Sequence, residues 1–263
     1  MKKLLFFLLL IPLLFMSTMS FGQSPFDGTW MTKLDTAKFP TKPDKYTVSN
    51  NMYECLTCVP KVAVKADGTD QKVTGHPYYD TIAVHVVDAS SIEIIRKKDG
   101  KTMVTDKQTV SSDGNTLTDK FTDDTEAKTV TGEVIETRVG KAPAGAHAVS
   151  GAWRTAKVNS VSDNGLTVTY QGNADGLKMN DPNGESYDAK FDGKDYPIQG
   201  DPGHTMVSLK RINDRTIEET DKRDGKVVGV YRMTVSPDGK SINAEYNDKE
   251  HGTTTSFTME KQS

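Results

Sequence analysis

Cysteine is scarce in this chain: its 263 residues include only two, Cys55 and Cys58. One bond between them cannot hold together a chain of this length, so the fold must depend on hydrophobic cores. After residue 22, no apolar run is long enough to span a bilayer whose hydrocarbon core is about 30 Å thick. We therefore expect neither a disulfide-scaffolded miniprotein nor membrane insertion.

Excess positive charge and catalytic motifs are also missing. The formal net charge is −3, which argues against binding to nucleic acid or anionic lipid, because both need a basic face. There is no nucleophile elbow, phosphate loop or zinc-protease helix. Residues 180–184 are typical of a turn and not of a calcium loop. We assign no catalytic residue, metal or cofactor, and we favour a protein that is not an enzyme.

The N-terminus has the pattern of a secretory signal. Lys2 and Lys3 precede the apolar run from Leu4 to Met16. Small residues at the −3 and −1 positions place a cleavage site after Gly22. The run is shorter than the ~20 residues of a helical span, although an uncleaved anchor is the alternative. We expect residues 1–22 to be a signal peptide and the mature chain to be exported, either to the periplasm or outside the cell.

An internal repeat is the strongest pattern in the sequence. Residues 65–123 align with residues 190–248 without a gap, and about 18 of the 59 positions are identical. Two copies of a unit of this size predict a pair of domains, because solenoid repeats are shorter and more numerous. We place the domains at residues 24–140 and 148–263. The small, proline-containing segment 141–147 is the predicted linker between them.

Each repeat is predicted to consist only of β-strands. Ile82, Val84 and Val86 alternate with other residues as in a half-buried strand. Asp-Gly pairs mark tight turns at equivalent places in both repeats, for example at residues 99–100 and 224–225. We expect eight or nine strands per repeat in hairpin succession. The predicted fold is two tandem antiparallel up-and-down β-barrels, and a β-sandwich is the competing architecture, which periodicity does not distinguish.

The two ends of each repeat resemble lipocalin and fatty-acid-binding (calycin) barrels. Each repeat opens with Gly-x-Trp, and a basic residue follows 108 positions after the tryptophan. The resemblance, which extends to tandem secreted bacterial lipocalin-like proteins, implies that Trp30 packs beneath Arg138 and Trp153 beneath Lys261 at the barrel floors. It also implies a barrel that can hold a small apolar or amphipathic ligand.

Cys55 and Cys58 form a Cys-x-x-Cys motif that admits three interpretations. A disulfide is favoured, because an exported protein meets an oxidising compartment. A redox-active pair needs a strand–helix context that the flanking residues do not indicate. A zinc site would add His76 and His85, but their spacing is not that of a zinc finger. The second repeat has no equivalent cysteines, so the pair is not part of the repeated fold.

His76, Tyr78 and Tyr79 surround a proline and are the predicted ligand-binding residues. Tyrosine offers a rigid apolar ring with one hydrogen-bonding group, which suits a barrel entrance. An ordinary turn with partly packed tyrosines is the alternative. The second repeat lacks both tyrosines, so we expect the first repeat to bind more strongly.

The preferred function is therefore non-enzymatic binding of a small apolar or amphipathic molecule. The alternative is a structural or envelope-interaction protein whose barrels are filled with side chains, and an enzyme is the third possibility. An apolar cavity would favour binding, whereas a filled core would favour interaction. The expected partner is a small hydrophobic molecule; we expect no nucleic acid and assign no protein partner.

Overall fold

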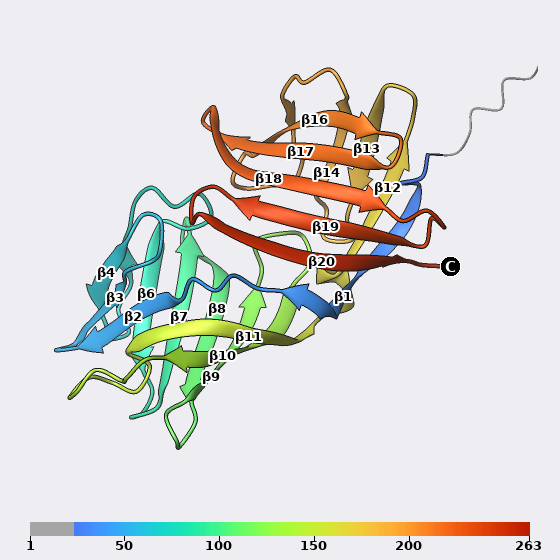
Figure 1. Ribbon diagram of the computed structural model, residues 1–263. Coiled ribbons are helices and arrows are strands. Elements are labelled where there is room, and N and C mark those ends of the chain that lie inside the picture. The colour runs from blue at the N-terminus through green and yellow to red at the C-terminus, as the bar shows by residue number, and fades with distance from the viewer. Residues whose placement is uncertain (1–23) are drawn as a thin grey trace, which may run out of the picture.

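The computed structural model describes residues 24–263, so the predicted signal peptide lies outside the described residues. Twenty β-strands and one 3-10 turn, η1 (Asp163–Gly165), make up the regular structure. The strands form two antiparallel sheets, each curled into a nearly closed barrel (Figure 1). This confirms the predicted all-β class and barrel architecture. Within the described part of the chain, no helix is long and apolar enough to cross a membrane.

The first barrel is continuous in sequence. Its strands follow the order β4-β3-β2-β11-β10-β9-β8-β7-β6-β5. Their bounds are β2 (Asp44–Ser49), β3 (Met52–Cys55), β4 (Val62–Lys65), β5 (Gln71–Lys72), β6 (Thr81–Val86), β7 (Ser91–Lys98), β8 (Lys101–Val110), β9 (Thr116–Asp123), β10 (Val130–Val139) and β11 (Gly151–Val161). A bridge between Asp67 and His85 brings its two edges together. The ten strands, of which β5 has only two residues, slightly exceed the predicted eight or nine.

The second barrel combines the C-terminal strands with the first strand of the chain. Its order is β14-β13-β12-β1-β20-β19-β18-β17-β16-β15. The bounds are β1 (Gly28–Lys38), β12 (Thr167–Gly172), β13 (Gly176–Asn180), β14 (Ser186–Lys190), β15 (Tyr196–Pro197), β16 (Met206–Asn213), β17 (Thr216–Arg223), β18 (Lys226–Val235), β19 (Ser241–Asp248) and β20 (Thr253–Lys261). A bridge between Ser186 and Gln199 nearly closes this barrel.

Tight turns of the predicted kind join the hairpins. β7 and β8 are connected by Asp99 and Gly100, whose φ angles are 50° and 80°. The equivalent hairpin of β17 and β18 has Asp224 and Gly225 at 49° and 74°. Two consecutive positive φ angles characterise the turn that matches the twist of paired strands, and they explain why Asp-Gly occurs there twice.

The two repeats exchange their first strands. Trp30 of β1 lies opposite Lys261 of β20, so this strand of the first repeat belongs to the second barrel. Trp153 of β11 lies opposite Arg138 of β10 in the first barrel. Figure 1 shows β1 running beside β20 while β11 continues the sheet of β10. The chain therefore passes between barrels at residues 39–43 and 162–166, and not at the predicted linker.

The predicted linker lies in a hairpin loop. Residues 140–150 connect β10 to β11, and these two strands pair with each other. The connections at residues 39–43 and 162–166 are shorter, yet each of them joins strands of different barrels. Among residues 24–263, β1 is the first strand and β20 the last, and these two strands pair with each other. The predicted division at residues 141–147 places the first strand of each repeat in that repeat's own barrel. In the structure, β11 belongs to the first barrel and β1 to the second.

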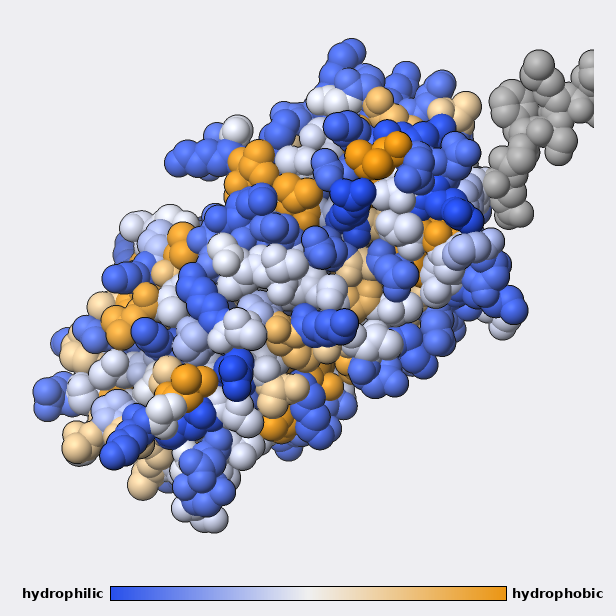
Figure 2. Space-filling view, viewed as in Figure 1, coloured by the Kyte–Doolittle hydropathy of each residue, from blue (hydrophilic) through white to orange (hydrophobic). Residues whose placement is uncertain are grey.

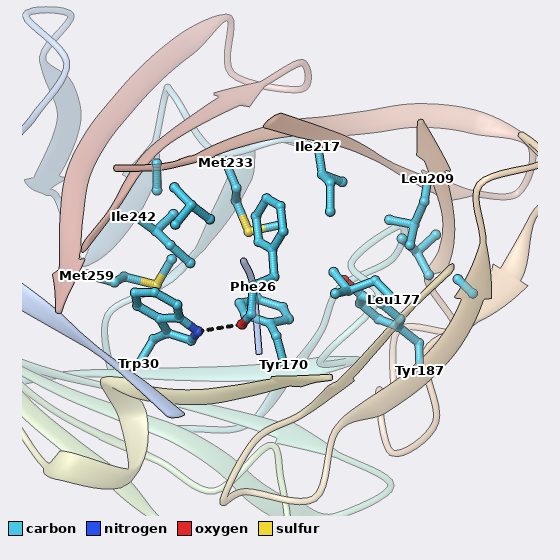
Figure 3. Close-up of a cluster of buried hydrophobic side chains, with 14 residues drawn as sticks. Phe26, Trp30, Tyr170, Leu177, Tyr187, Leu209, Ile217, Met233, Ile242 and Met259 are labelled. Carbon is cyan, nitrogen blue, oxygen red and sulfur yellow. Dashed lines mark hydrogen bonds between the residues drawn. The ribbon is translucent and has the colours of Figure 1, made fainter. Parts of the chain in front are cut away.

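Each barrel core is built around one tryptophan. Trp30 and Trp153 are fully buried. The indole N–H of Trp30 donates to the carbonyl oxygen of Phe26 at 2.8 Å (Figure 3), and that of Trp153 donates to the carbonyl oxygen of Val149 at the same distance. The identical geometry shows that both repeats use the same core plan although their first strands are exchanged.

A basic residue covers each tryptophan, with the partners exchanged relative to the expectation. The guanidinium carbon of Arg138 lies 3.9 Å from the ring centre of Trp153, and Nζ of Lys261 lies 5.4 Å from that of Trp30. Arg138 also donates hydrogen bonds to three backbone carbonyls, those of Gly114, Ala148 and Ser150. The predicted pairs Trp30–Arg138 and Trp153–Lys261 are replaced because β1 and β11 have changed places.

Candidate functional site

One cavity lies at an end of the second barrel. It measures about 680 Å³. Apolar side chains from three separate segments line it: Phe26 before β1, Phe191 after β14 and Ile217 on β17. Charged side chains of both signs line the same cavity, namely Lys190 and Arg211 together with Asp27, Asp175, Asp188 and Asp214. The arrangement combines an apolar surface with a polar rim.

Local contacts fix the walls of this cavity. The carboxylate of Asp27 accepts the backbone N–H groups of Ser24 at 3.0 Å and Gly172 at 2.6 Å, which ties the N-terminal segment to β12. The guanidinium carbon of Arg211 lies 4.3 Å from the ring centre of Phe191. The N-terminal segment and this stacked pair therefore each fix part of the cavity wall.

The first barrel has a shallower hollow at the equivalent end. It measures about 540 Å³ and is lined in part by Val48, Ala66 and Val86. In the aligned repeats, Ala66 and Val86 take the places of Phe191 and Arg211. The first barrel therefore lacks the stacked wall of the second. We expected the first repeat to bind more strongly, but the hollow in the first barrel is smaller than the cavity in the second barrel.

The three predicted ligand-binding residues divide between two environments. The rings of His76 and Tyr79 stack with centres 4.4 Å apart, and the guanidinium of Arg96 lies 5.7 Å from the Tyr79 ring. Tyr78 points toward the second barrel, where Arg223 lies 5.5 Å from its ring centre. Burial raises the pKa of Tyr78 to about 12. The structure brings two of the three together, and none of them lines the 680 Å³ cavity.

Cys55 and Cys58 are joined by a disulfide with an S–S distance of 2.06 Å. The bond closes the end of β3 onto the following loop. The backbone N–H of Cys58 also points to the sulfur of Cys55 at 3.0 Å. The favoured interpretation of the motif is thus the one found, and it leaves neither thiolate for a zinc site with His76 and His85.

A cluster of carboxylates at the junction of the barrels was not predicted. Glu126, in the loop between β9 and β10, meets Asp181 and Glu185 of the turn between β13 and β14, with oxygen atoms within 4.8 Å of one another. Burial, followed by the charge of Asp181, raises the pKa of Glu126 to about 7. Burial and the charge of Glu126 raise that of Glu185 to about 8. The raised pKa values of Glu126 and Glu185 favour the protonated form of these two carboxyls.

This cluster predicts a stability that falls with rising pH. A carboxyl whose folded-state pKa is raised stabilises the fold below its ordinary pKa, and this contribution is lost as the pH rises through the folded-state value. We expect the thermal midpoint to fall between pH 5 and pH 9, and Glu185→Gln to reduce that slope. Glu245→Gln, on the exposed face of β19, is the matched control. An unchanged slope in Glu185→Gln, measured by scanning calorimetry, would contradict the assignment.

Sequence reasoning missed the cavity and the junction for the same reason. Phe26, Phe191 and Ile217 are far apart in the chain, as are Glu126 and Glu185, and no local motif joins them. Any function of the cavity and of the carboxylate cluster must therefore be inferred from their geometry. No family model, no curated protein and no solved structure matches this chain.

Proposed function

We propose that this protein is exported, is not an enzyme, and binds one small amphipathic molecule in the cavity of the second barrel. The observation that carries the proposal is the cavity itself. Its volume of about 680 Å³ lies within the range of small-molecule sites, which are mostly apolar with a few placed polar groups. The lipocalin-like resemblance, in which barrels hold such ligands, supports the same function.

The lining suggests how the ligand lies. Phe26 and Ile217 are buried, with exposed fractions of 2% each, and they offer an apolar floor. Arg211 donates one hydrogen bond to the carbonyl oxygen of Asn173 at 3.0 Å, which leaves further donors of its planar group for a ligand. An apolar or aromatic body would therefore pack on the floor while an acceptor-bearing head group meets Arg211 and Lys190.

A fluorescent probe with this chemistry tests the proposal. We expect 8-anilinonaphthalene-1-sulfonate, an aromatic body with an anionic head, to bind the mature protein saturably. Arg211→Val and Phe191→Ala copy the residues of the first barrel, and each should weaken binding at least tenfold, because a charged hydrogen bond or a buried ring contributes about 1.5–3 kcal/mol.

Arg232→Val is the matched control for these variants. Arg232 lies on the same barrel but is exposed on β18, outside the cavity. Its replacement should leave the affinity unchanged. Equal binding by all four proteins, or a signal that never saturates, would count against the cavity as the binding site.

A structural or interaction protein is the second candidate, and the filled interior of the second barrel favours it. Figure 3 shows the interior of the second barrel occupied by side chains such as Trp30, Leu177 and Met259. On the face in Figure 2, however, hydrophobic residues form small groups among hydrophilic ones. Stable protein interfaces usually have an apolar centre. If the probe does not bind saturably, a structural or interaction protein becomes the favoured candidate.

A further inference from the structure

The interior of the first barrel contains a layer of polar side chains. Gln108 of β8 and Glu136 of β10 are buried, with exposed fractions of 5% and 8%. Asp119 of β9 lies between them in the sheet, and the side-chain amide of Gln108 donates to its carboxylate at 3.2 Å. Three neighbouring strands thus place two carboxyl groups and an amide on one inner surface.

Each of these three residues has one buried oxygen without a hydrogen-bond partner. The atoms are Oε1 of Gln108, Oδ1 of Asp119 and Oε2 of Glu136. Buried polar atoms in folded proteins are nearly always paired. All three atoms are acceptors in the ionised site, so the group that would satisfy them must supply N–H or O–H donors.

The second barrel shows that the fold does not require this polar layer. The equivalent positions in the aligned repeat are Met233, Ala244 and Met259, all of them buried in the hydrophobic core. The strand register is the same, because Met233 lies opposite Ala244 as Gln108 lies opposite Asp119. The barrel therefore accepts apolar residues at all three places, and the polar set has a role other than folding.

The charges around the layer favour a cation. Arg96 is paired with Asp106, whereas Asp119 and Glu136 form no ion pair. The ring of Tyr46 lies 6.3 Å from that of Tyr53 in a stacked arrangement. Aromatic faces and carboxylates together are typical of sites for organic cations.

We propose that the interior of the first barrel is a second binding site, which takes a small organic cation with N–H donors, of the class of protonated primary amines. Among residues 24–263, only the junction cluster brings three carboxylates within 4.8 Å of one another. Asp106, Asp119 and Glu136 are thus too widely spaced to share one metal ion, and an ammonium group with three divergent donors suits them better. The side chains of Asp106 and Arg96 are 12% and 24% exposed, so the polar layer reaches the surface.

The site has an expected pH dependence. Burial and the charge of Asp106 raise the pKa of Asp119 to about 6. Burial and the charges of Asp44 and Asp119 raise that of Glu136 to about 7. The other groups facing them are Tyr46, Tyr53, Arg96 and Gln108. At pH 8.5 both carboxyls are ionised and ready for a cation, whereas at pH 5.0 protons neutralise them.

Calorimetric titration of the mature protein with ethylammonium chloride at pH 8.5 tests the proposal. We expect saturable binding at least tenfold tighter than that of tetramethylammonium, which has the charge but no N–H donor. At pH 5.0 the affinity should fall at least tenfold. Sodium chloride at equal ionic strength controls for screening.

Variants that copy the second barrel separate binding from folding. Glu136→Met and Asp119→Ala should each weaken ethylammonium binding at least tenfold while the thermal midpoint stays equal or rises. Glu219→Gln, in the interior of the second barrel, should leave that affinity unchanged. Absence of saturable binding at pH 8.5, equal affinity for tetramethylammonium, or unaltered binding by Glu136→Met would overturn the proposal. This site and the cavity of the second barrel take different probes, so the two proposals fail independently.

Discussion

A fragment containing only residues 44–161 is expected to unfold in one cooperative transition. It holds all ten strands of the first barrel in unbroken order, from β2 to β11. It also keeps the contact of Arg138 with Trp153, which closes the barrel floor. A complete hydrophobic core inside a nearly closed sheet allows a small domain to fold alone.

The matched fragment is residues 24–140, which follows the boundary of the repeat. It keeps β1 but lacks β11, so β10 has no hairpin partner and Arg138 has no tryptophan at its observed place. We expect the midpoint of its unfolding in urea, measured by circular dichroism, to lie well below that of residues 44–161. The reverse order of midpoints would show that the exchanged strands do not define the folding units.

Trp30→Ala is expected to destabilise the second barrel, although Trp30 belongs to the first repeat. Its side chain is fully buried in the cluster that contains Ile242 and Met259. Replacing a buried tryptophan by alanine costs about 3–5 kcal/mol of unfolding free energy, because contacts are lost and a cavity remains. The loss should fall on residues 167–261 and leave the first barrel near its original stability.

The chain offers an internal reporter for this experiment, since it has only two tryptophans. In Trp30→Ala, the fluorescence of Trp153 follows the first barrel alone, while circular dichroism follows both. We expect the fluorescence midpoint in urea to stay nearly constant as part of the dichroism signal moves to lower urea. The reciprocal variant Trp153→Ala should give the mirror result. A fluorescence midpoint that falls with Trp30→Ala would contradict the strand exchange.

Local patterns were sufficient to predict the fold class. The turns at Asp99-Gly100 and Asp224-Gly225 are correct because the backbone geometry of a two-residue hairpin selects those residue types. Alternating residues such as Ile82 and Val84 are correct because one face of their strand is buried. Both signals depend on only a few neighbouring residues, so they can be recognised without knowledge of distant contacts.

The strand exchange could not be predicted from the same patterns. Gly28-x-Trp30 and Gly151-x-Trp153 are equivalent motifs, so either strand fits beside either basic residue. The outcome depends on which edges pair between distant parts of the chain, and local motifs carry no information about such pairing. The contact between a tryptophan and a basic residue was foreseeable, but its partners were not.

The candidate sites were foreseen only in small part. Tyr78 and Tyr79 are adjacent in sequence and point to different barrels, which a motif cannot reveal. A signal for the polar layer was present, however. Comparing the repeats shows Gln108, Asp119 and Glu136 in place of Met and Ala, on inward-facing positions of three strands.

The exchange of first strands also sets the order in which the chain can be completed. Of the twenty strands in residues 24–263, β1 is synthesised first, yet its partner β20 is synthesised last. The first barrel can close as soon as residue 161 is available, whereas the second must wait for residue 261. Pairing over so long a separation is slow, and during the wait β1 can occupy the free edge of β10. We expect rapid arrival of β11 at that edge to compete with this non-exchanged pairing.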